Sequence, residues 1–176
     1  MQNILILFLC PDITTWENRL LSHITKYQCQ IEESRTMFCG TELASFMRVS
    51  GNWDALAKLE DTLANLKADQ LCIEFKRVQA LKFSEEHLPY VVQMLGANKS
   101  TLIQDITIFF NAQAIQIIDL QTDGFKSVYS DTKLLNLFMR IHIPTTLNIA
   151  DVRERFMLLC EDLNVDGILE PEKTIK

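Results

Sequence analysis

The pattern of apolar and polar residues in the first half of the chain predicts the element order β-α-β-β-α-β. Residues 4–10 are all apolar, which is typical of a strand covered on both faces, and Pro11-Asp12 ends the stretch. The next apolar residues recur at helical spacing, at Ile13, Trp16, Leu20, Ile24 and Tyr27. Thr14 and Glu17 have the spacing of a capping box, which predicts the start of this helix.

A hairpin, a helix and a strand complete this half. Residues 29–38 and 41–50 are predicted strands around a turn at Cys39-Gly40. Asn52 is expected to cap a helix, and residues 71–78 to form the last strand. The apolar stripe of that helix consists of Leu56, Leu59, Leu63 and Leu66.

The same order begins again after residues 79–88, which lack periodicity and are the predicted linker. Strands are expected at 90–96 and 115–120, with a helix between them whose apolar face is Leu102, Ile106, Phe109 and Phe110. Residues 134–143 alternate as in a strand with one covered face, made of Leu135, Leu137, Met139, Ile141 and Ile143. Asn148 is expected to cap the next helix, and a closing strand to follow from Gly167.

The two halves are also weakly similar in sequence. Gln30-Ile31 aligns with Gln116-Ile117, and the segment FMRV at 46–49 aligns with FMRI at 138–141. The offset grows by six residues between these pairs, which predicts a longer second hairpin that turns at Asp123-Gly124. Offsets that grow only between elements indicate a duplication with loop insertion.

These observations predict an α+β fold of two tandem ferredoxin-like βαββαβ domains at residues 1–79 and 88–176. Each domain is expected to be an antiparallel sheet with two helices on one face. With 176 residues, 48% of them hydrophobic, the chain is long enough for two small cores.

Charge and cysteine usage narrow the class of protein. The 23 acidic and 17 basic residues give a net charge of −6, the opposite of the basic surface by which proteins bind nucleic acid directly. The apolar opening is too short to span a membrane and lacks the features of a signal peptide. Five scattered cysteines without a C-x-x-C pair argue against a disulfide framework and a zinc site, and predict reduced thiols in the cytoplasm.

No motif of catalysis is found. The three histidines fall in three settings, His23 in a helix, His87 in the linker and His142 in a strand, and no nucleophile motif or phosphate-binding glycine loop is present. Glu32 and Glu33 point to opposite faces of their strand, so they cannot act as an acid-base pair, and cross-strand pairing with Arg48 is expected instead. The sequence therefore predicts a protein that is not an enzyme and needs neither cofactor nor metal.

Two turns are candidate ligand sites, because each joins a first strand to a helix whose free N–H groups attract carboxylate or phosphate. The turns are Asp12-Ile13-Thr14-Thr15 and Asn98-Lys99-Ser100-Thr101. The alternative is plain helix capping by Thr14 and Ser100. The second turn is favoured, since Ile103 stands where the first has the competing carboxylate of Glu17, and Lys99 adds positive charge.

Two phenylalanines on central strands, Phe46 and Phe138, raise the alternative of RNA binding. Folds of this order stack RNA bases on aromatic residues at such positions. The surrounding sequence lacks the expected basic and glycine-rich pattern, so packing of each sheet face against the partner domain is preferred.

Three short segments carry a resemblance to a known family. They are IEESR at 31–35, VSGNWDAL at 49–56 and CEDLNVDG at 160–167, which lie in both halves and in the family's order. On these segments the chain resembles the glycine-cleavage transcriptional repressors, which are built of two tandem ACT domains. The resemblance implies a regulator without enzymatic activity. It also implies that the ACT domains pair through their sheets, which could produce a homodimer, and that they bind amino acids at the first loop.

The resemblance further implies that the chain acts on a separate DNA-binding transcriptional activator and that glycine relieves the effect. The chain departs from the family at one point, because Thr14 and Thr15 stand where Pro and Gly are usual after Asp12. A β-branched residue hinders the close ligand approach that glycine permits. Two functions therefore stay open: an amino-acid-responsive regulator, or an ACT scaffold that binds partners but no ligand.

Overall fold

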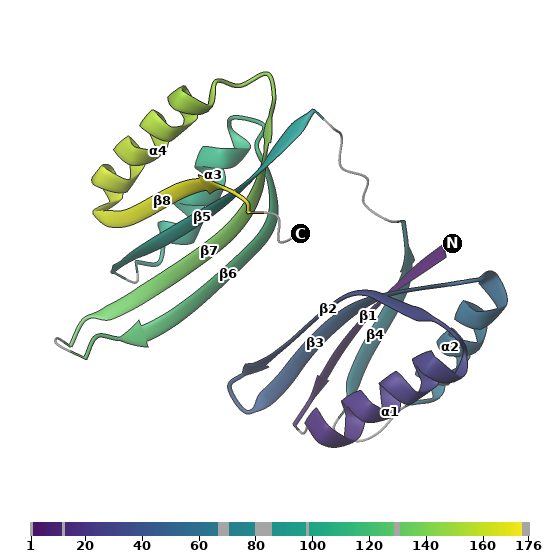
Figure 1. Cartoon of the computed structure of the whole chain (residues 1–176). Coiled ribbons are helices and arrows are strands. Elements are labelled where there is room, and N and C mark those ends of the chain that lie inside the picture. Colours follow the sequence, from purple (N-terminus) through teal and green to yellow (C-terminus); the bar gives the residue numbers. More distant parts are fainter. Residues whose placement is uncertain are drawn as a thin grey trace. The chain divides into compact units, whose positions relative to one another are not determined.

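The computed structural model describes residues 2–11, 13–66, 71–79, 86–97, 99–128 and 131–173, and for residues 13–17 the backbone alone. Contacts between residues divide the chain into two compact units, Met1–Lys82 and Phe83–Lys176 (Figure 1). Most of the predicted linker lies outside the described residues. His87 and Leu88, which were assigned to it, instead begin the first strand of the second unit.

Each unit is a four-stranded antiparallel sheet with two helices. The first unit comprises β1 (Gln2–Cys10), α1 (Ile13–Lys26), β2 (Gln30–Cys39), β3 (Glu42–Gly51), α2 (Trp53–Asn65) and β4 (Cys72–Val78), with strand order β2-β3-β1-β4. The second comprises β5 (His87–Ala97), α3 (Leu102–Asn111), β6 (Gln116–Lys126), β7 (Lys133–Pro144), α4 (Ile149–Leu163) and β8 (Val165–Pro171), with order β6-β7-β5-β8. The predicted α+β fold of two βαββαβ units is confirmed.

The core of the first unit lies between its helices and one face of its sheet. Ile4, Ile6, Phe8 and Cys10 of β1 are buried with the leucines of α2. The intervening residues of β1 point to the other face, where Leu7 is 48% exposed and Leu9 43%. The prediction that both faces of this strand are covered is therefore wrong, because both helices lie on the same side of the sheet (Figure 1).

The second core repeats this arrangement. The five residues predicted for the covered face of β7, Leu135, Leu137, Met139, Ile141 and Ile143, are all buried. Phe110 of α3 stacks on Phe156 of α4 with ring centroids 6.1 Å apart. Aromatic pairs at this distance add to the stability that burial alone provides.

The two hairpins turn differently. In the first, the turn lies at Gly40-Thr41, one residue later than predicted, because Cys39 still pairs with Glu42. Gly40 adopts a φ of +68°, which glycine tolerates better than other residues. In the second, the predicted turn at Asp123-Gly124 is wrong, since these residues lie in β6 opposite Asn136 and Leu135. The ladder continues through the Phe125–Leu134 pair, and Ser127 N donates to Thr132 O at 3.0 Å beyond it.

A bulge and an arginine pair occur at equivalent places in both units. The register of β2 against β3 shifts between Ile31 and Glu33, and that of β6 against β7 between Ile117 and Asp119. The residue after each bulge meets an arginine on the next strand: Glu33 lies 3.8 Å from Arg48, and Asp119 lies 3.5 Å from Arg140. The cross-strand pairing predicted for Arg48 is confirmed, and the repetition agrees with the duplication read from the sequence.

Helix caps follow the sequence at two of the four helices. Asn52 accepts a hydrogen bond from Ala55 N at 2.8 Å, and Asn148 accepts one from Ala150 N at 2.9 Å. Helix α1 begins at Ile13, so Thr14 lies inside the first turn and not at the predicted cap position. The cap residue of α3 is Thr101, whose side chain makes no capping hydrogen bond, so the assignment of Ser100 as cap is also wrong.

We predict that Asn52→Ala and Asn148→Ala each lower the free energy of unfolding of their own unit by about 1 kcal/mol, because each leaves a helix amide without its acceptor. The measurement is urea unfolding followed by circular dichroism. Asn52→Asp and Asn148→Asp are the controls, since aspartate keeps the acceptor. Equal stability of the alanine and aspartate variants would contradict the capping role.

Candidate functional site

The first candidate turn is described only in part. Asp12 lies outside the described residues, while Ile13, Thr14 and Thr15 form the first turn of α1, with their side chains undescribed. The turn does join the central strand β1 to a helix, as predicted. Its role as a ligand site stays a prediction.

The second candidate turn lies between β5 and α3. Asn98 is outside the described residues, and Lys99, Ser100 and Thr101 are exposed. Lys99 N donates to Ala97 O at 2.8 Å, and Leu102 N donates to Lys99 O at 3.2 Å. Two of the amides in this turn are therefore engaged by the turn itself.

The remaining amides of this turn are available to a ligand. Within the described part of the chain, the N–H groups of Ser100, Thr101 and Ile103 donate to no acceptor. Free N–H groups at a helix N-terminus favour an anion. Sequence reasoning missed Asp105, whose carboxylate lies in the first turn of α3 and competes for the same positive end.

Lys99 has a structural partner that the sequence did not indicate. Its ammonium donates to the carbonyl oxygen of Leu163 at the C-terminal end of α4, with an Nζ–O distance of 2.9 Å. A cation at this end of a helix is favoured by the helix dipole. The second turn is thereby attached to the segment where α4 passes into β8.

A close approach of strands supports the same attachment. Gly96, just before the turn, lies against Val165, and a Cβ on Gly96 would be 2.3 Å from Val165 Cγ1. Only a residue without a side chain fits here. The backbone leading into the turn is therefore positioned by the start of β8.

The histidines form no catalytic set. His87 and His142 lie on neighbouring strands with ring centroids 6.5 Å apart, and the ring of His23 in α1 stacks on Tyr27, which follows the helix. Burial lowers the pKa of His142, and the nearby His87 lowers it further. Among the residues that the structure describes, no three histidine, cysteine or acidic side chains come together as metal ligands.

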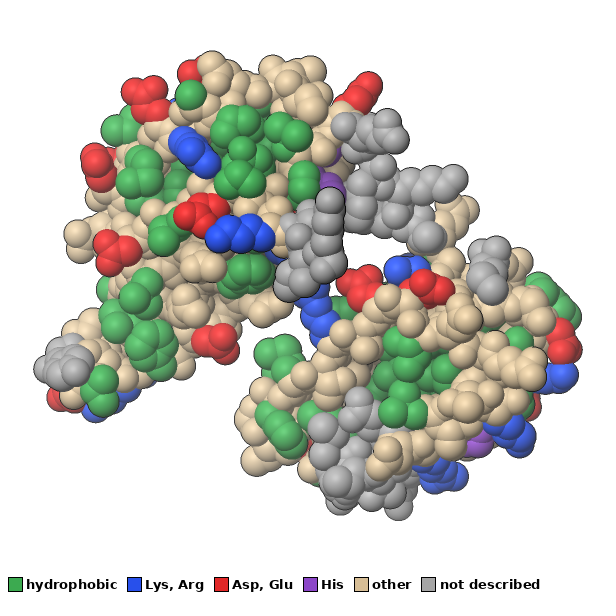
Figure 2. All heavy atoms as spheres, in the orientation of Figure 1, with side chains coloured by type: hydrophobic (Ala, Val, Ile, Leu, Met, Phe, Trp, Pro, Cys, Tyr) green, Lys and Arg blue, Asp and Glu red, His purple; other side chains and the backbone are tan. Residues whose placement is uncertain are grey.

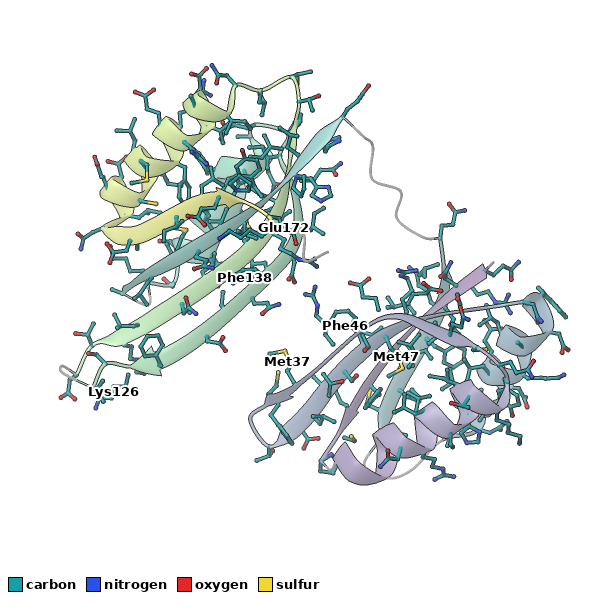
Figure 3. All side chains as sticks on the ribbon, in the orientation of Figure 1. Met37, Phe46, Met47, Lys126, Phe138 and Glu172 are labelled. Carbon is teal, nitrogen blue, oxygen red and sulfur yellow. The ribbon has the colours of Figure 1, made fainter. Side chains whose placement is uncertain are left out.

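The uncovered sheet faces carry the two phenylalanines. Phe46 on β3 has the guanidinium of Arg35 at 5.9 Å from its ring centroid, and Phe138 on β7 lies opposite Gln93 and Gln121 (Figure 3). Apolar side chains reach the surface of both units (Figure 2). Packing of these faces against a partner domain stays a prediction.

Comparison with known proteins agrees with this architecture. The ACT domain model matches residues 2–76. The glycine cleavage system transcriptional repressor of Escherichia coli (strain K12) is 28% identical over 151 residues, which are 85% of this chain and 80% of that protein. The protein of that name from Shigella flexneri matches over the same share.

Two solved structures share the fold over the whole chain. A protein of unknown function from Galdieria sulphuraria superposes with a TM-score of 0.76 at 18% identity, over 98% of this chain and 99% of that one. A protein provisionally assigned as a glycine cleavage system transcriptional repressor superposes with a TM-score of 0.71 at 22% identity, over 98% of each chain.

The resemblance found in the sequence is confirmed by these matches. The chain consists of two ACT-like βαββαβ units and is similar to proteins named as repressors, which supports a regulatory role. Within the described residues, no helix is both long and apolar enough to cross a membrane.

We predict that His142 titrates below the ordinary histidine pKa of about 6.5. Because folding then favours the neutral ring, the stability contributed by this group is present above that pH and is lost as the pH falls toward the lower folded value. An NMR titration of the His142 ring measures the pKa directly. Replacing His87 by Gln removes one cause and should raise the pKa of His142.

A His142 pKa at or above 6.5 would contradict this description of its surroundings. An unchanged value in the His87→Gln variant would leave burial and the nearby Arg140 as the causes of the lowered pKa.

Proposed function

We propose that this chain, similar throughout to glycine cleavage repressors, is a non-enzymatic accessory repressor in the cytoplasm that acts through a DNA-binding activator protein. The observation that carries the proposal is the match to the Escherichia coli repressor over 85% of the chain, which spans both units and not only the ACT domain at residues 2–76. A relative that shared one ACT unit alone would support regulation in general but not this role.

The charge distribution supports a protein partner over direct contact with DNA. Helix α3 has no lysine or arginine, and in α2 the ammonium of Lys58 is paired with Asp54 at 2.6 Å. The uncovered face of the second sheet holds Asp123 and Glu170. A recognition helix in a DNA groove needs exposed cations to contact phosphates, and α2 and α3 do not supply them. Helix α4 has two exposed arginines, Arg153 and Arg155, but also four acidic residues, so its net charge is negative.

We predict that the purified chain shows no sequence-specific binding to the promoter of the glycine cleavage genes at physiological salt. An electrophoretic mobility shift with the chain alone tests this. Nanomolar binding that discriminates the promoter from unrelated DNA would contradict the proposal that the chain acts through a protein partner.

A small amino acid such as glycine is the proposed effector, and the second turn its site. A zwitterion needs donors for its carboxylate and an acceptor for its ammonium. The free amides of Ser100, Thr101 and Ile103 are suitable donors, and we assign the acceptor to Asn98. The first turn, from Asp12 to Thr15, is the weaker candidate because two β-branched threonines follow Asp12.

We predict that Asn98→Ala weakens glycine binding by on the order of 1 kcal/mol or more, the cost of a lost hydrogen bond to a charged group. Isothermal titration calorimetry of the full chain measures the affinity. Asn136→Ala, an exposed asparagine on β7, is the matched control and should bind as the unchanged chain does. If the Asn98→Ala variant binds glycine with the same affinity as the unchanged chain, the effector does not bind at this turn.

The second candidate function is a scaffold that binds partners but no amino acid. The threonines in the first turn and the Asp105 carboxylate in the second favour it. A thermal-shift screen against the twenty amino acids separates the two functions, because a ligand of the folded state must raise the melting temperature. The scaffold predicts no shift with any of them.

A reporter experiment tests the proposed function as a whole. The chain is expressed in an Escherichia coli strain that lacks its own glycine cleavage repressor and carries a reporter behind a glycine cleavage promoter. We expect repression that added glycine relieves, and that is lost when the activator is deleted. A reporter that does not respond to the chain would overturn the proposal.

A further inference from the structure

Strand β8 leaves one side of its backbone unpaired beside a groove. It is the last strand in the order β6-β7-β5-β8, and among the described residues it pairs along Val165–Pro171 with β5 alone. Helix α4 runs next to it, and between them lies a cavity of about 260 Å³ lined by Arg153, Phe156 and Met157 of α4 and by residues 167–170 of β8. An edge strand with a neighbouring groove is the geometry used by domains that bind a peptide as an added strand.

The floor of the groove is apolar and close-packed at one end. Met157 is 48% exposed and Ile168 53%, although both are large hydrophobic residues. At Gly167 a Cβ would lie 2.4 Å from Cys160 Sγ, so only glycine allows α4 to approach the strand this closely. Cys160 and Phe156 fill the space that a side chain at Gly167 would take, so α4 lies directly against β8 at this end of the groove.

The charges along β8 specify what can bind. Asp166 and Glu170 are exposed and lie on the same face of the strand on either side of Ile168, and β8 contains no cation. A second copy paired antiparallel about Ile168 would place Asp166 opposite Glu170, and like charges directly opposite destabilise a pair. The edge of β8 therefore disfavours pairing with a second copy of β8 and favours pairing with a strand that carries basic residues.

The opposite wall of the groove has the reverse charge. Arg153, an exposed residue of α4, lines the cavity. A cation placed in the cavity would be repelled by this guanidinium. Glu170 lines the same cavity, and its carboxylate would repel an acidic side chain. We therefore expect neutral side chains to enter the groove and basic ones to lie on the uncovered sheet face.

We propose that β8 and α4 form a docking groove for an extended basic segment of a protein partner. The segment adds to β8 as an antiparallel strand and has the pattern basic, apolar, apolar, apolar, basic. Its outer residues lie beside Asp166 and Glu170, and its second and fourth residues enter the cavity. The inference rests on the proposed function in one respect, that the partner is a protein.

Fluorescence anisotropy with a labelled peptide tests the groove on the full chain. The probe is Lys-Leu-Val-Leu-Lys flanked by Gly-Ser on both sides, and the comparison peptide replaces both lysines by glutamate. We expect the basic peptide to bind roughly ten-fold more tightly than the acidic one, from two charge pairs at an exposed edge. The double variant Asp166→Lys, Glu170→Lys should reverse this preference.

Two further variants make the result specific. Glu74→Lys changes an equivalent charge on β4, the edge strand of the first sheet, and should leave binding unchanged. Met157→Glu places a charge in the groove and should weaken binding of the basic peptide. Circular dichroism establishes that each variant folds, and if the double variant does not, the two peptides still compare binding on the unchanged chain.

Three outcomes would overturn the inference: equal affinity for the two peptides, an unaltered preference in the double variant, or a chain dimer that Met157→Glu abolishes. The last would assign the groove to a second copy. If the peptides fail to bind while the reporter still responds to the chain, the docking groove is wrong and the proposed function stands. If the peptide binds and the reporter does not respond, the docking groove stands and the proposed function is wrong.

Discussion

The one-sided covering of each sheet is the constraint on which the rest of the structure depends. In both units the two inner strands pair on both edges, and each β-α-β crossover connects two parallel strands that lie on either side of one inner strand. The strands that start the two crossovers run antiparallel to each other, and the crossovers move in opposite directions across the sheet, so two right-handed connections place both helices on the same face. Every second residue of the central strand is therefore buried under helices, and the residues between them remain on an uncovered face.

This constraint places the chemistry at turns and edges. The cores are filled with aliphatic and aromatic side chains. A two-pronged ion pair between elements of the first unit is structural: Arg77 donates to both carboxylate oxygens of Glu60, at 2.7 and 2.9 Å. That pairing lowers the pKa of Glu60. The two proposed sites rest on the amides at the start of α3 and on the edge of β8, and both lie next to the segment around Val165.

Sequence patterns predicted correctly those features that depend on interactions between residues close in the sequence. The alternation in β7 and the caps at Asn52 and Asn148 depend on neighbours within a few residues, and the structure confirms all three. The turn expected at Asp123-Gly124 failed because pairing with β7 outweighs the turn preference of that dipeptide. The contact of Lys99 with Leu163 joins residues 64 positions apart, so no local pattern could reveal it.

Sedimentation velocity of the chain mixed with the activator of the glycine cleavage genes, without DNA, tests the central claim most directly. Regulation through a protein partner predicts a complex that sediments faster than the chain alone and faster than the activator alone. The free chain is expected to sediment as a monomer or a homodimer. Independent sedimentation of the two proteins, together with binding of promoter DNA by the chain alone, would contradict the account.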